Sequence, residues 1–290
     1  MIELSPAQLQ RFRFLEARLL WEGALRRKDL CSAFGLTPNH VTREIGCYRD
    51  RYPGNLLYDT EARAWRATER FQPRHASGDA KEYLELLLAF SLAGDPAIMV
   101  GTGPAVPVEM LPEMEGSVSA DVLRPLVAAI GQQQGVEIVY QSFSKTTPQR
   151  RIIWPRTLVY VLSRWHVRAY DERRVRFADF VVNRIIQCSP PKGPADLRTA
   201  SQNDIEWLQS IEVAVQPAPH LSASQQSVVA KQFGMRQTDA GWRWSAKVRQ
   251  CMVKYFLHQH RLDLPTESGA RARIVLCDPA IAENHAFSDD

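Results

Sequence analysis

The sequence of 290 residues predicts an α+β protein made of several domains. In residues 1–75, apolar side chains recur at helical spacing between capping residues and glycines. Residues 136–186 hold short runs of β-branched and aromatic residues, among them 151–154 and 157–162 on either side of Pro155, that are separated by polar or Pro-containing turns, as in a small antiparallel β-structure. After residue 204, strand-like and helix-like stretches alternate, so a mixed C-terminal domain is expected.

Length and composition narrow the class of protein. The chain is long enough for two or three domains with separate cores. It holds no run of about 18 apolar residues and no basic, apolar leader, which predicts a cytoplasmic protein without a membrane partner. Its five cysteines are widely spaced and include no CxxC pair, so neither a disulfide framework nor a metal site is expected.

The N-terminal domain, residues 1–75, is expected to contain three helices. Ser5 and Pro6 are typical of the start of the first helix, and Gly23 of its end. Gly35 and Thr37 separate the second helix from the third. The expected spans are 4–21, 26–34 and 39–51. Two short helices joined by a tight turn, after a longer one, are typical of a helix-turn-helix.

The third helix has the pattern of a recognition helix. Val41, Ile45 and Tyr48 share its inner face. Polar residues, including Glu44, are therefore expected at its exposed N-terminal end, where a recognition helix reads base edges in the major groove. Arg43 suits a guanine and Asn39 an adenine. The predicted DNA contacts are Thr37, Asn39, His40, Thr42 and Arg43.

Residues 56–71 form two strand-like runs around a turn at residues 59–63, which predicts a hairpin. Such a wing would offer Arg63 and Arg66 to phosphates or to the minor groove. Residues 1–75 hold 13 Lys/Arg and 9 Asp/Glu, an excess equal to the net charge of +4 of the whole chain. A basic excess confined to one small domain indicates nucleic-acid binding. The alternative is an ordinary three-helix bundle, which shows the same caps and the same apolar face.

Residues 76–133 are expected to form a helical linker. A helix over 79–92 begins with acidic residues, as the helix dipole favours, and another covers 119–133. Residues 94–116 between them are rich in Gly and Pro and are expected to be a loop. A phosphate-binding loop at residues 101–104 is rejected, because the Gly-Lys-Ser/Thr ending is missing.

The central domain, residues 134–190, is predicted to be a small antiparallel β-barrel-like module. Its residues 136–186 hold ten Lys/Arg and four Asp/Glu, which favours an anionic ligand. Tyr140, Ser142 and Ser144 alternate, so on an extended strand they would face the same side. Hydroxyls and guanidinium groups together would suit a phosphate or carboxylate. The candidate pocket residues are Tyr140, Ser142, Ser144, Arg151, His166, Arg168 and Arg184. Alternatively, the hydroxyls line a solvated strand face, and His166 is structural.

These residues also carry a family resemblance. Tyr140-Gln-Ser142-Phe-Ser144, Arg151 before Pro155, Trp165-His166-Val167-Arg168-Ala-Tyr170-Asp171 and Arg184-Ile185 resemble the Sm-like WYL domain of bacterial transcriptional regulators. The name-giving Trp-Tyr-Leu stands here as Trp165-His166-Val167. The resemblance implies a domain that senses nucleotides or nucleic-acid fragments, with Tyr140, Ser142, Arg151, Arg168 and Arg184 in its pocket. Residues 41–73 are likewise similar to the winged helix of WYL-domain regulators of bacterial anti-phage defence operons, associated with BREX and CBASS systems.

Residues 190–204 are expected to be a linker by composition. Beyond it, a C-terminal extension, residues 205–290, is predicted to contain strands at 211–217, 242–248 and 273–277 and helices at 222–233 and 250–260. Met252, Val253, Phe256 and Leu257 are expected inside, and residues 283–290 frayed. This extension resembles the one that follows WYL domains and often pairs two protomers.

No motif of a hydrolase, a metalloprotease, a P-loop or a zinc deaminase is present. We therefore expect no enzyme, no catalytic residue and no cofactor. The sequence predicts a homodimeric DNA-binding repressor that binds an inverted repeat in double-stranded DNA and is relieved by an anionic nucleotide-like or nucleic-acid effector. The alternative is a nucleic-acid sensor or nuclease-like enzyme that acts on oligonucleotides.

Overall fold

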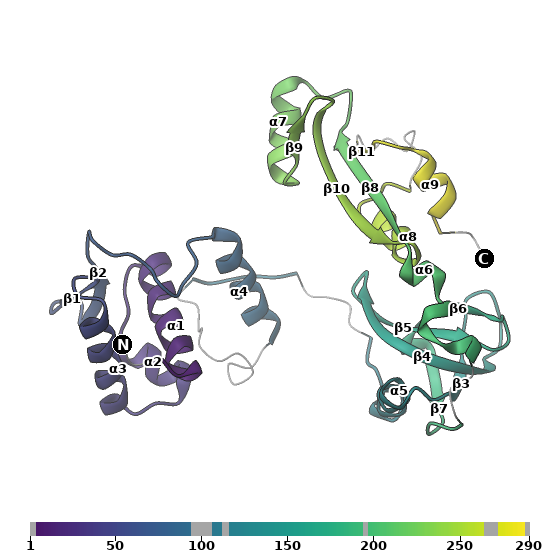
Figure 1. The fold of residues 1–290 in the computed structure, drawn as a ribbon, viewed down its shortest axis with the longest axis horizontal. Coiled ribbons are helices and arrows are strands. Elements are labelled where there is room, and N and C mark those ends of the chain that lie inside the picture. The colour runs from purple at the N-terminus through teal and green to yellow at the C-terminus, as the bar shows by residue number, and fades with distance from the viewer. Residues whose placement is uncertain (1–3, 94–105, 112–115, 194–196, 264–271, 288–290) are drawn as a thin grey trace. The chain divides into compact units, whose positions relative to one another are not determined.

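The computed structural model describes residues 4–93, 106–111, 116–193, 197–263 and 272–287 (Figure 1). The chain forms two compact units, Met1–Pro112 and Glu113–Asp290. The predicted Gly/Pro-rich loop lies largely outside the described residues, and so does the rejected phosphate loop at 101–104. No helix of the described ranges has the length and apolar character needed to cross a membrane.

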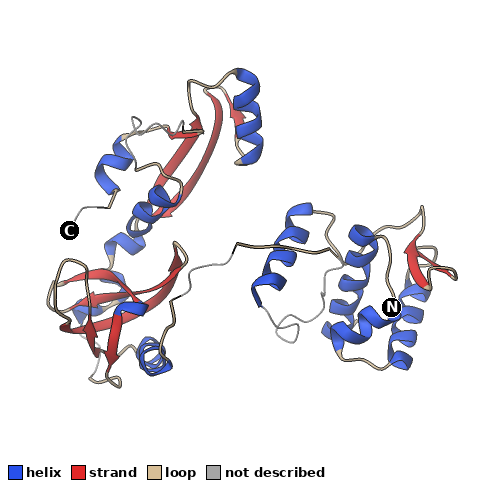
Figure 2. Ribbon diagram, turned by 180° about the vertical axis from the view of Figure 1, so that it is seen from behind, coloured by secondary structure: helices blue, strands red, loops and turns tan. Residues whose placement is uncertain are grey.

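The first unit is helical with one hairpin (Figure 2). Its elements are α1 (Pro6–Glu22), α2 (Arg27–Phe34), α3 (Pro38–Arg51), β1 (Leu56–Asp59), β2 (Ala64–Ala67) and α4 (Ala80–Ala93). Ser5 caps α1 in a reciprocal capping box with Gln8, and Gly23 ends this helix in the left-handed region. β1 and β2 pair in antiparallel register from Leu56 opposite Ala67 to Asp59 opposite Ala64. The predicted three helices and wing are confirmed.

The core of the first unit joins the inner faces of α1 and α3. Phe12, Leu15, Val41, Ile45 and Tyr48 are each at most 2% exposed. The rings of Phe12 and Tyr48 meet edge to face, with centroids 5.1 Å apart. The helical spacing of apolar residues therefore sets the orientation of α3, and its other side faces solvent.

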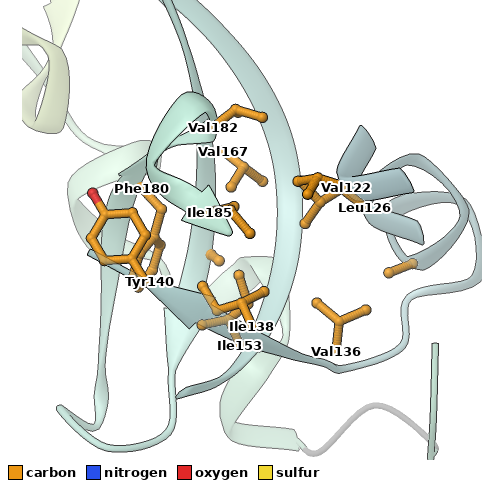
Figure 3. Close-up of a cluster of buried hydrophobic side chains, with 12 residues drawn as sticks. Val122, Leu126, Val136, Ile138, Tyr140, Ile153, Val167, Phe180, Val182 and Ile185 are labelled. Carbon is orange, nitrogen blue, oxygen red and sulfur yellow. The ribbon is translucent and has the colours of Figure 1, made fainter. Parts of the chain in front are cut away.

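The central domain of the second unit is a five-stranded antiparallel sheet with α5 against it. The elements are α5 (Ala120–Gln132), β3 (Val136–Tyr140), β4 (Gln149–Val161), β5 (Arg164–Asp171), β6 (Arg176–Val181), the 3₁₀ turn η1 (Val182–Arg184) and β7 (Ile185–Cys188). The strand order is β6-β5-β4-β3-β7. Val122 and Leu126 of α5 face Ile138, Val167 and Ile185 of the sheet (Figure 3).

The central sheet differs from the expected barrel-like module in three respects. The runs predicted on either side of Pro155 form one strand, β4, whose pairing shifts between Pro155 and Thr157. Proline has no amide hydrogen, so the strand continues past it through a bulge. Within the described residues, no pairing between the two edge strands β6 and β7 closes the sheet into a barrel; the turn η1 connects them. Ser142 and Ser144 lie beyond the end of β3 and not on a strand.

The C-terminal domain is a second antiparallel sheet, of order β11-β8-β10-β9. Its elements are β8 (Ser210–Pro217), α7 (Ala223–Gln232), β9 (Arg236–Thr238), β10 (Gly241–Arg249), α8 (Gln250–Gln259), β11 (Ile274–Leu276) and α9 (Ala280–His285). The predicted strands and helices are present, whereas β9 and α9 were missed. The expectation of a frayed end is wrong for residues 283–285, which belong to α9; residues 288–290 lie outside the described ranges. Cys251 and Tyr255 are buried on α8 in addition to Val253 and Leu257, while Met252 and Phe256 are half-buried.

A connecting segment, residues 197–208, joins the two sheets and is more ordered than its composition predicts. It contains the short turns η2 (Leu197–Thr199) and η3 (Ser201–Asn203) and the helix α6 (Ile205–Leu208). Thr199 is 1% and Asp204 4% exposed. The predicted linker over residues 190–204 is therefore packed at its C-terminal end, because Asp204 is both the N-cap of α6 and a partner of Arg168.

Candidate DNA-binding surface and effector pocket

The exposed stripe of α3 carries three of the predicted DNA contacts. Asn39, Thr42 and Arg43 are exposed, while Val41 and Ile45 of the same helix are buried. Residues three and four apart share a helix face, so these three side chains stand together at its N-terminal end. The arrangement offers an amide, a hydroxyl and a guanidinium to one surface.

Other polar residues near the start of α3 also serve the helix itself. The Thr37 hydroxyl accepts a hydrogen bond from the His40 amide at 3.4 Å, and the Thr42 hydroxyl donates to the Pro38 carbonyl at 2.9 Å. His40 Nε2 lies 3.3 Å from Glu44 Oε1. The expectation that Glu44 is exposed is wrong: it is 8% exposed and accepts a bond of 2.8 Å from Arg11 of α1. It helps to fix α3 on α1.

The two wing arginines have different surroundings. Arg63 is exposed at the turn, with a positive φ of 49°. Arg66 is exposed too, but its Nε donates to Asp59 Oδ2 at 2.7 Å. The amide of Ala62 and the charge of Arg66 hold the pKa of Asp59 below its ordinary value. Arg63 is thus the wing cation without a carboxylate partner among the described residues.

Three further cations lie beside the wing and were missed. Arg26, Arg27 and Lys28 are exposed at the start of α2. They follow Leu25, whose backbone exchanges hydrogen bonds of 2.8 Å with Trp65 of β2. Cations at a helix N-terminus oppose the helix dipole, so three in succession indicate a role outside the helix. That signal is present in the sequence and points to phosphate contacts.

A buried carboxylate holds the recognition helix in place. Glu16 is fully buried on α1 and accepts the Tyr48 hydroxyl of α3 at 2.8 Å. It also accepts the backbone amides of residues 74–76, at 2.8, 2.6 and 2.9 Å. Burial raises the pKa of Tyr48, and the charge of Glu16 raises it further. The segment after the wing is thereby fastened to both helices.

A pocket of about 410 Å³ opens on the central sheet. It brings together five of the seven predicted residues, namely Tyr140, Ser142, Ser144, Arg151 and Arg184. The two serine hydroxyls lie 3.3 Å apart. Phe143, Asp171, Arg174, Asp179 and Phe180 also line this pocket and were not predicted as pocket residues. We refer to this candidate ligand site as the effector pocket.

The arginines of the effector pocket differ in their partners. Arg151 is 8% exposed, and its Nη1 lies 2.5 Å from Asp171 Oδ2, so its charge is matched. Arg184 is half-buried, and its guanidinium lies 4.0 Å from the ring centroid of Phe143. Within the described ranges Arg184 makes no ion pair. Arg174 also lines the pocket, is exposed and makes no ion pair in the described part of the chain. Both arginines can therefore receive an anion, and Phe143, 88% exposed, provides an aromatic face beside Arg184.

The structure does not bring His166 and Arg168 into the effector pocket, which is lined by the other five predicted residues. Both face the side of β5 that packs on the connecting segment and α8. His166 is 6% exposed, its ring centroid lies 5.3 Å from that of Tyr255, and burial lowers its pKa. Arg168 is 2% exposed and donates from Nε and Nη2 to the two oxygens of Asp204 at 2.7 and 2.6 Å. Alternation along β5 cannot tell these two faces apart, because both are buried.

Asp179 of β6 connects the effector pocket with the C-terminal domain. The residue belongs to the lining of the pocket, and its side chain is only 3% exposed. Oδ1 accepts from Arg168 Nη1 at 3.2 Å. Oδ2 accepts from the Tyr255 hydroxyl at 3.2 Å and lies 3.4 Å from Lys254 Nζ, both on α8. Burial lowers the pKa of Arg168, but the Asp204 hydrogen bond and the Asp179 charge raise it above its ordinary value overall.

Family comparisons match each part of the chain separately. Residues 7–89 match the winged helix-turn-helix domain of the BrxR transcriptional regulator, residues 121–190 the WYL domain, and residues 210–281 the C-terminal dimerization domain of BrxR. The DNA-binding transcriptional repressor CapW of Pseudomonas aeruginosa is 31% identical over 258 residues, which cover 88% of this chain and 83% of that protein.

CapW of Escherichia coli strain KTE188 is 29% identical over 88% of this chain and 83% of its own length. CapW of Stenotrophomonas maltophilia is 28% identical over 88% and 84%. Among solved structures, PafBC of Arthrobacter aurescens covers 97% of this chain and 46% of its own, at 13% identity and a TM-score of 0.30. That likeness is too weak to carry an argument.

Proposed function

Because this chain belongs to the family of the DNA-binding transcriptional repressor CapW, we propose that it is a repressor which binds operator DNA as a homodimer. The observation that carries the proposal is the exposed stripe of Asn39, Thr42 and Arg43 on α3, flanked by the wing. Two copies of this surface, related by a two-fold axis, fit an inverted repeat. The match of residues 210–281 to a dimerization domain supports pairing through the C-terminal domain.

In this proposal α3 lies in the major groove. Arg43 donates to a guanine and Asn39 pairs with an adenine. Thr37, His40 and Thr42 position the start of the helix, and the lone pairs of the Thr42 hydroxyl, whose hydrogen is donated to the Pro38 carbonyl, can accept from a donor on a base edge. Arg63, and less strongly Arg66, binds phosphates or the minor groove from the wing, together with Arg26, Arg27 and Lys28.

The effector is proposed to be an anionic nucleotide or nucleic-acid fragment. Three features of the effector pocket support this: Arg184 without a carboxylate partner among the described residues, the adjacent hydroxyls of Ser142 and Ser144, and the exposed ring of Phe143. Phosphate oxygens suit the first two and a base suits the third. The effector can relieve repression only to the extent that it binds the free arrangement of the dimer more tightly than the DNA-bound arrangement.

The genes under control are proposed to be an anti-phage defence operon, and the place of action the bacterial cytoplasm, where the operator lies. The resemblance of residues 41–73 to regulators of such operons supports this.

The first test is a fluorescence-anisotropy titration of the full chain with duplex DNA from upstream of its own gene and with a shuffled duplex. We expect the upstream duplex to bind at least about 10³-fold more tightly. Arg43→Ala should weaken the specific complex by about 1–3 kcal/mol and leave the shuffled duplex nearly unaffected.

Arg124→Ala, which removes the same charge from the exposed surface of α5, is the matched control for that titration. Equal affinity of the unaltered chain for both duplexes would refute sequence-specific repression. If Arg43→Ala weakens binding to both duplexes equally, the assignment of Arg43 to a base contact is refuted, but sequence-specific repression is not.

A further inference from the structure

A second cavity lies between α5, β4 and the connecting segment. Its volume is about 270 Å³, and it shares no lining residue with the effector pocket. Its walls include Ile130 of α5 and Trp207 of α6. Its polar lining comes from Gln133, Arg156, Thr157, Arg168, Ser201, Gln202 and Asp204. It is therefore a separate space on the same domain.

Arg156 at this cavity has no counter-charge among the described residues. Its Nη2 donates to the carbonyl and, at 2.9 Å, to the hydroxyl of Thr199, both neutral groups. Its Nε is buried and makes no hydrogen bond within the described structure. Burial lowers the pKa of this guanidinium. A desolvated cation with an unused donor is costly unless an anion accompanies it.

The arginines inside the central domain differ in whether they make an ion pair. Arg151 is paired with Asp171, and Arg168 with Asp204 and Asp179. Arg156 and Arg184 are half-buried and make no ion pair in the part of the chain that the structure describes. Each of these two lines a different cavity, Arg184 the effector pocket and Arg156 the second one. The need for an anion therefore arises at two places.

The rest of the second cavity is compatible with an anion. Asp204 is acidic, but both its oxygens accept from Arg168, and Oδ1 also accepts the Trp207 amide at 3.3 Å. The exposed rim carries the Gln133 amide, the Ser201 hydroxyl and the Gln202 amide, all able to donate. Arg249 lies 4.6 Å from the ring centroid of Trp207 and adds positive charge behind that wall.

We propose that this cavity is a second ligand site, for a compact oxyanion of the phosphate class bound by Arg156. The site goes beyond the effector pocket and does not depend on it. Arg156 belongs to β4, whereas Thr199 and Ser201 belong to the connecting segment that leads to the C-terminal domain. An occupant would therefore fasten this segment to the central sheet and stabilise the attachment of the C-terminal domain.

The test is calorimetric titration of the full chain, first with inorganic phosphate and separately with a nucleoside monophosphate. Arg156→Gln should weaken binding at one site by about 10- to 100-fold, the loss of a charge-assisted hydrogen bond. Arg184→Gln should leave this site unchanged. Binding of phosphate alone would identify the free ion as the ligand class, and binding of the monophosphate alone a phosphorylated small molecule.

A second variant distinguishes the loss of the site from a failure of the first variant to fold. Ser201→Phe fills the cavity from its exposed rim, leaves Arg156 in place and should block binding equally. Circular dichroism and the melting temperature confirm that both variants fold. The proposal is overturned if the unaltered chain binds neither probe, or if Arg156→Gln and Ser201→Phe bind as tightly as the unaltered chain. Loss in Arg184→Gln with no change in Arg156→Gln would support the effector pocket alone.

Discussion

Arg63 and Arg66 stand on the same wing but differ in what lies beside them. Arg63 extends from the turn, whereas Arg66 is held by Asp59 at 2.7 Å. A cation that already neutralises a carboxylate gains less from a phosphate, because it must give up that partner first. Arg63 is therefore available for a phosphate contact, whereas Arg66 is already paired within the hairpin.

Arg63→Ala is expected to lower the slope of log affinity against log salt by about 0.9, the value for one phosphate contact on duplex DNA. Arg66→Ala should lower it by clearly less. Anisotropy titrations at several salt concentrations measure both slopes, with Arg124→Ala as the control for loss of a distant charge. Equal slopes for the two wing variants would show that the Asp59 pair opens on DNA.

His166 is 6% exposed, and its burial is expected to make the second unit sensitive to acid. Its pKa is lowered in the folded state by burial, so below its ordinary value of about 6.5 the unfolded chain binds the proton more readily than the folded chain. Stability should therefore fall as the pH is lowered from about 7 to 5, by at most about 1.4 kcal/mol per unit for this group.

Urea unfolding of the unaltered chain and of His166→Gln at several pH values measures the effect. The variant should show a flatter dependence on pH. His260, whose pKa burial also lowers, remains in both proteins and serves as the internal control. An identical slope in both would show that His166 is not the group responsible.

The side chains at the sites could be predicted only in part. Arg43 lies near the start of a helix and Arg184 in a turn. The local sequence pattern is therefore enough to predict that these charged side chains are accessible. Arg168 has the same charge on a strand of the same type, but what decides its role is Asp204, 36 residues away in the chain. Such a partner lies on another element, and strand periodicity contains no information about it.

At the scale of elements, α5 shows how one helix closes the central sheet. Leu126 is fully buried against the sheet (Figure 3). Leu123 on the same helix is 36% exposed. Leu126→Ala should destabilise the second unit by about 2–5 kcal/mol, because it removes packed methyl groups and leaves a cavity. Leu123→Ala is the matched control and should cost much less. Urea unfolding measures both, and equal costs would show that α5 is not docked as described.

Elements were predictable where their signals are local. Ser5, Gly23 and Thr37 mark the ends of helices, and the structure confirms them. β4 was divided at Pro155, because proline usually ends a strand; the bulge that accommodates it depends on the pairing with β5. The connecting segment was taken for a linker because its composition is polar, and its order comes from Arg168 and Arg156, which lie on other elements.

At the scale of the whole molecule, the central and C-terminal domains share a buried ionic network. Arg168, Asp179 and Asp204 form its centre, with Tyr255 and Lys254 on α8. The resemblance assigns Arg168 to ligand binding, but its neighbours assign it to the attachment of one domain to the other. The loss of one partner leaves the remaining buried charges unmatched.

Arg168→Met is accordingly expected to destabilise the second unit by about 3–5 kcal/mol. It should also increase hydrogen exchange in β5, β6 and α8 together. Arg164→Met, on the exposed end of the same strand, is the control. Exchange of amide hydrogens followed by mass spectrometry measures the effect, and a change confined to β5 would contradict a shared network.

The position of Asp179 has a consequence for how such repressors can be recombined. A central domain transplanted from a relative would bring its own β6 but would meet an α8 that evolved with another partner. A functional hybrid that changes effector specificity should therefore retain the stretch from β5 through α8 from one parent, because Arg168, Asp179, Asp204 and Tyr255 must match one another. The winged helix, whose core contains none of these residues, is the part that can be exchanged.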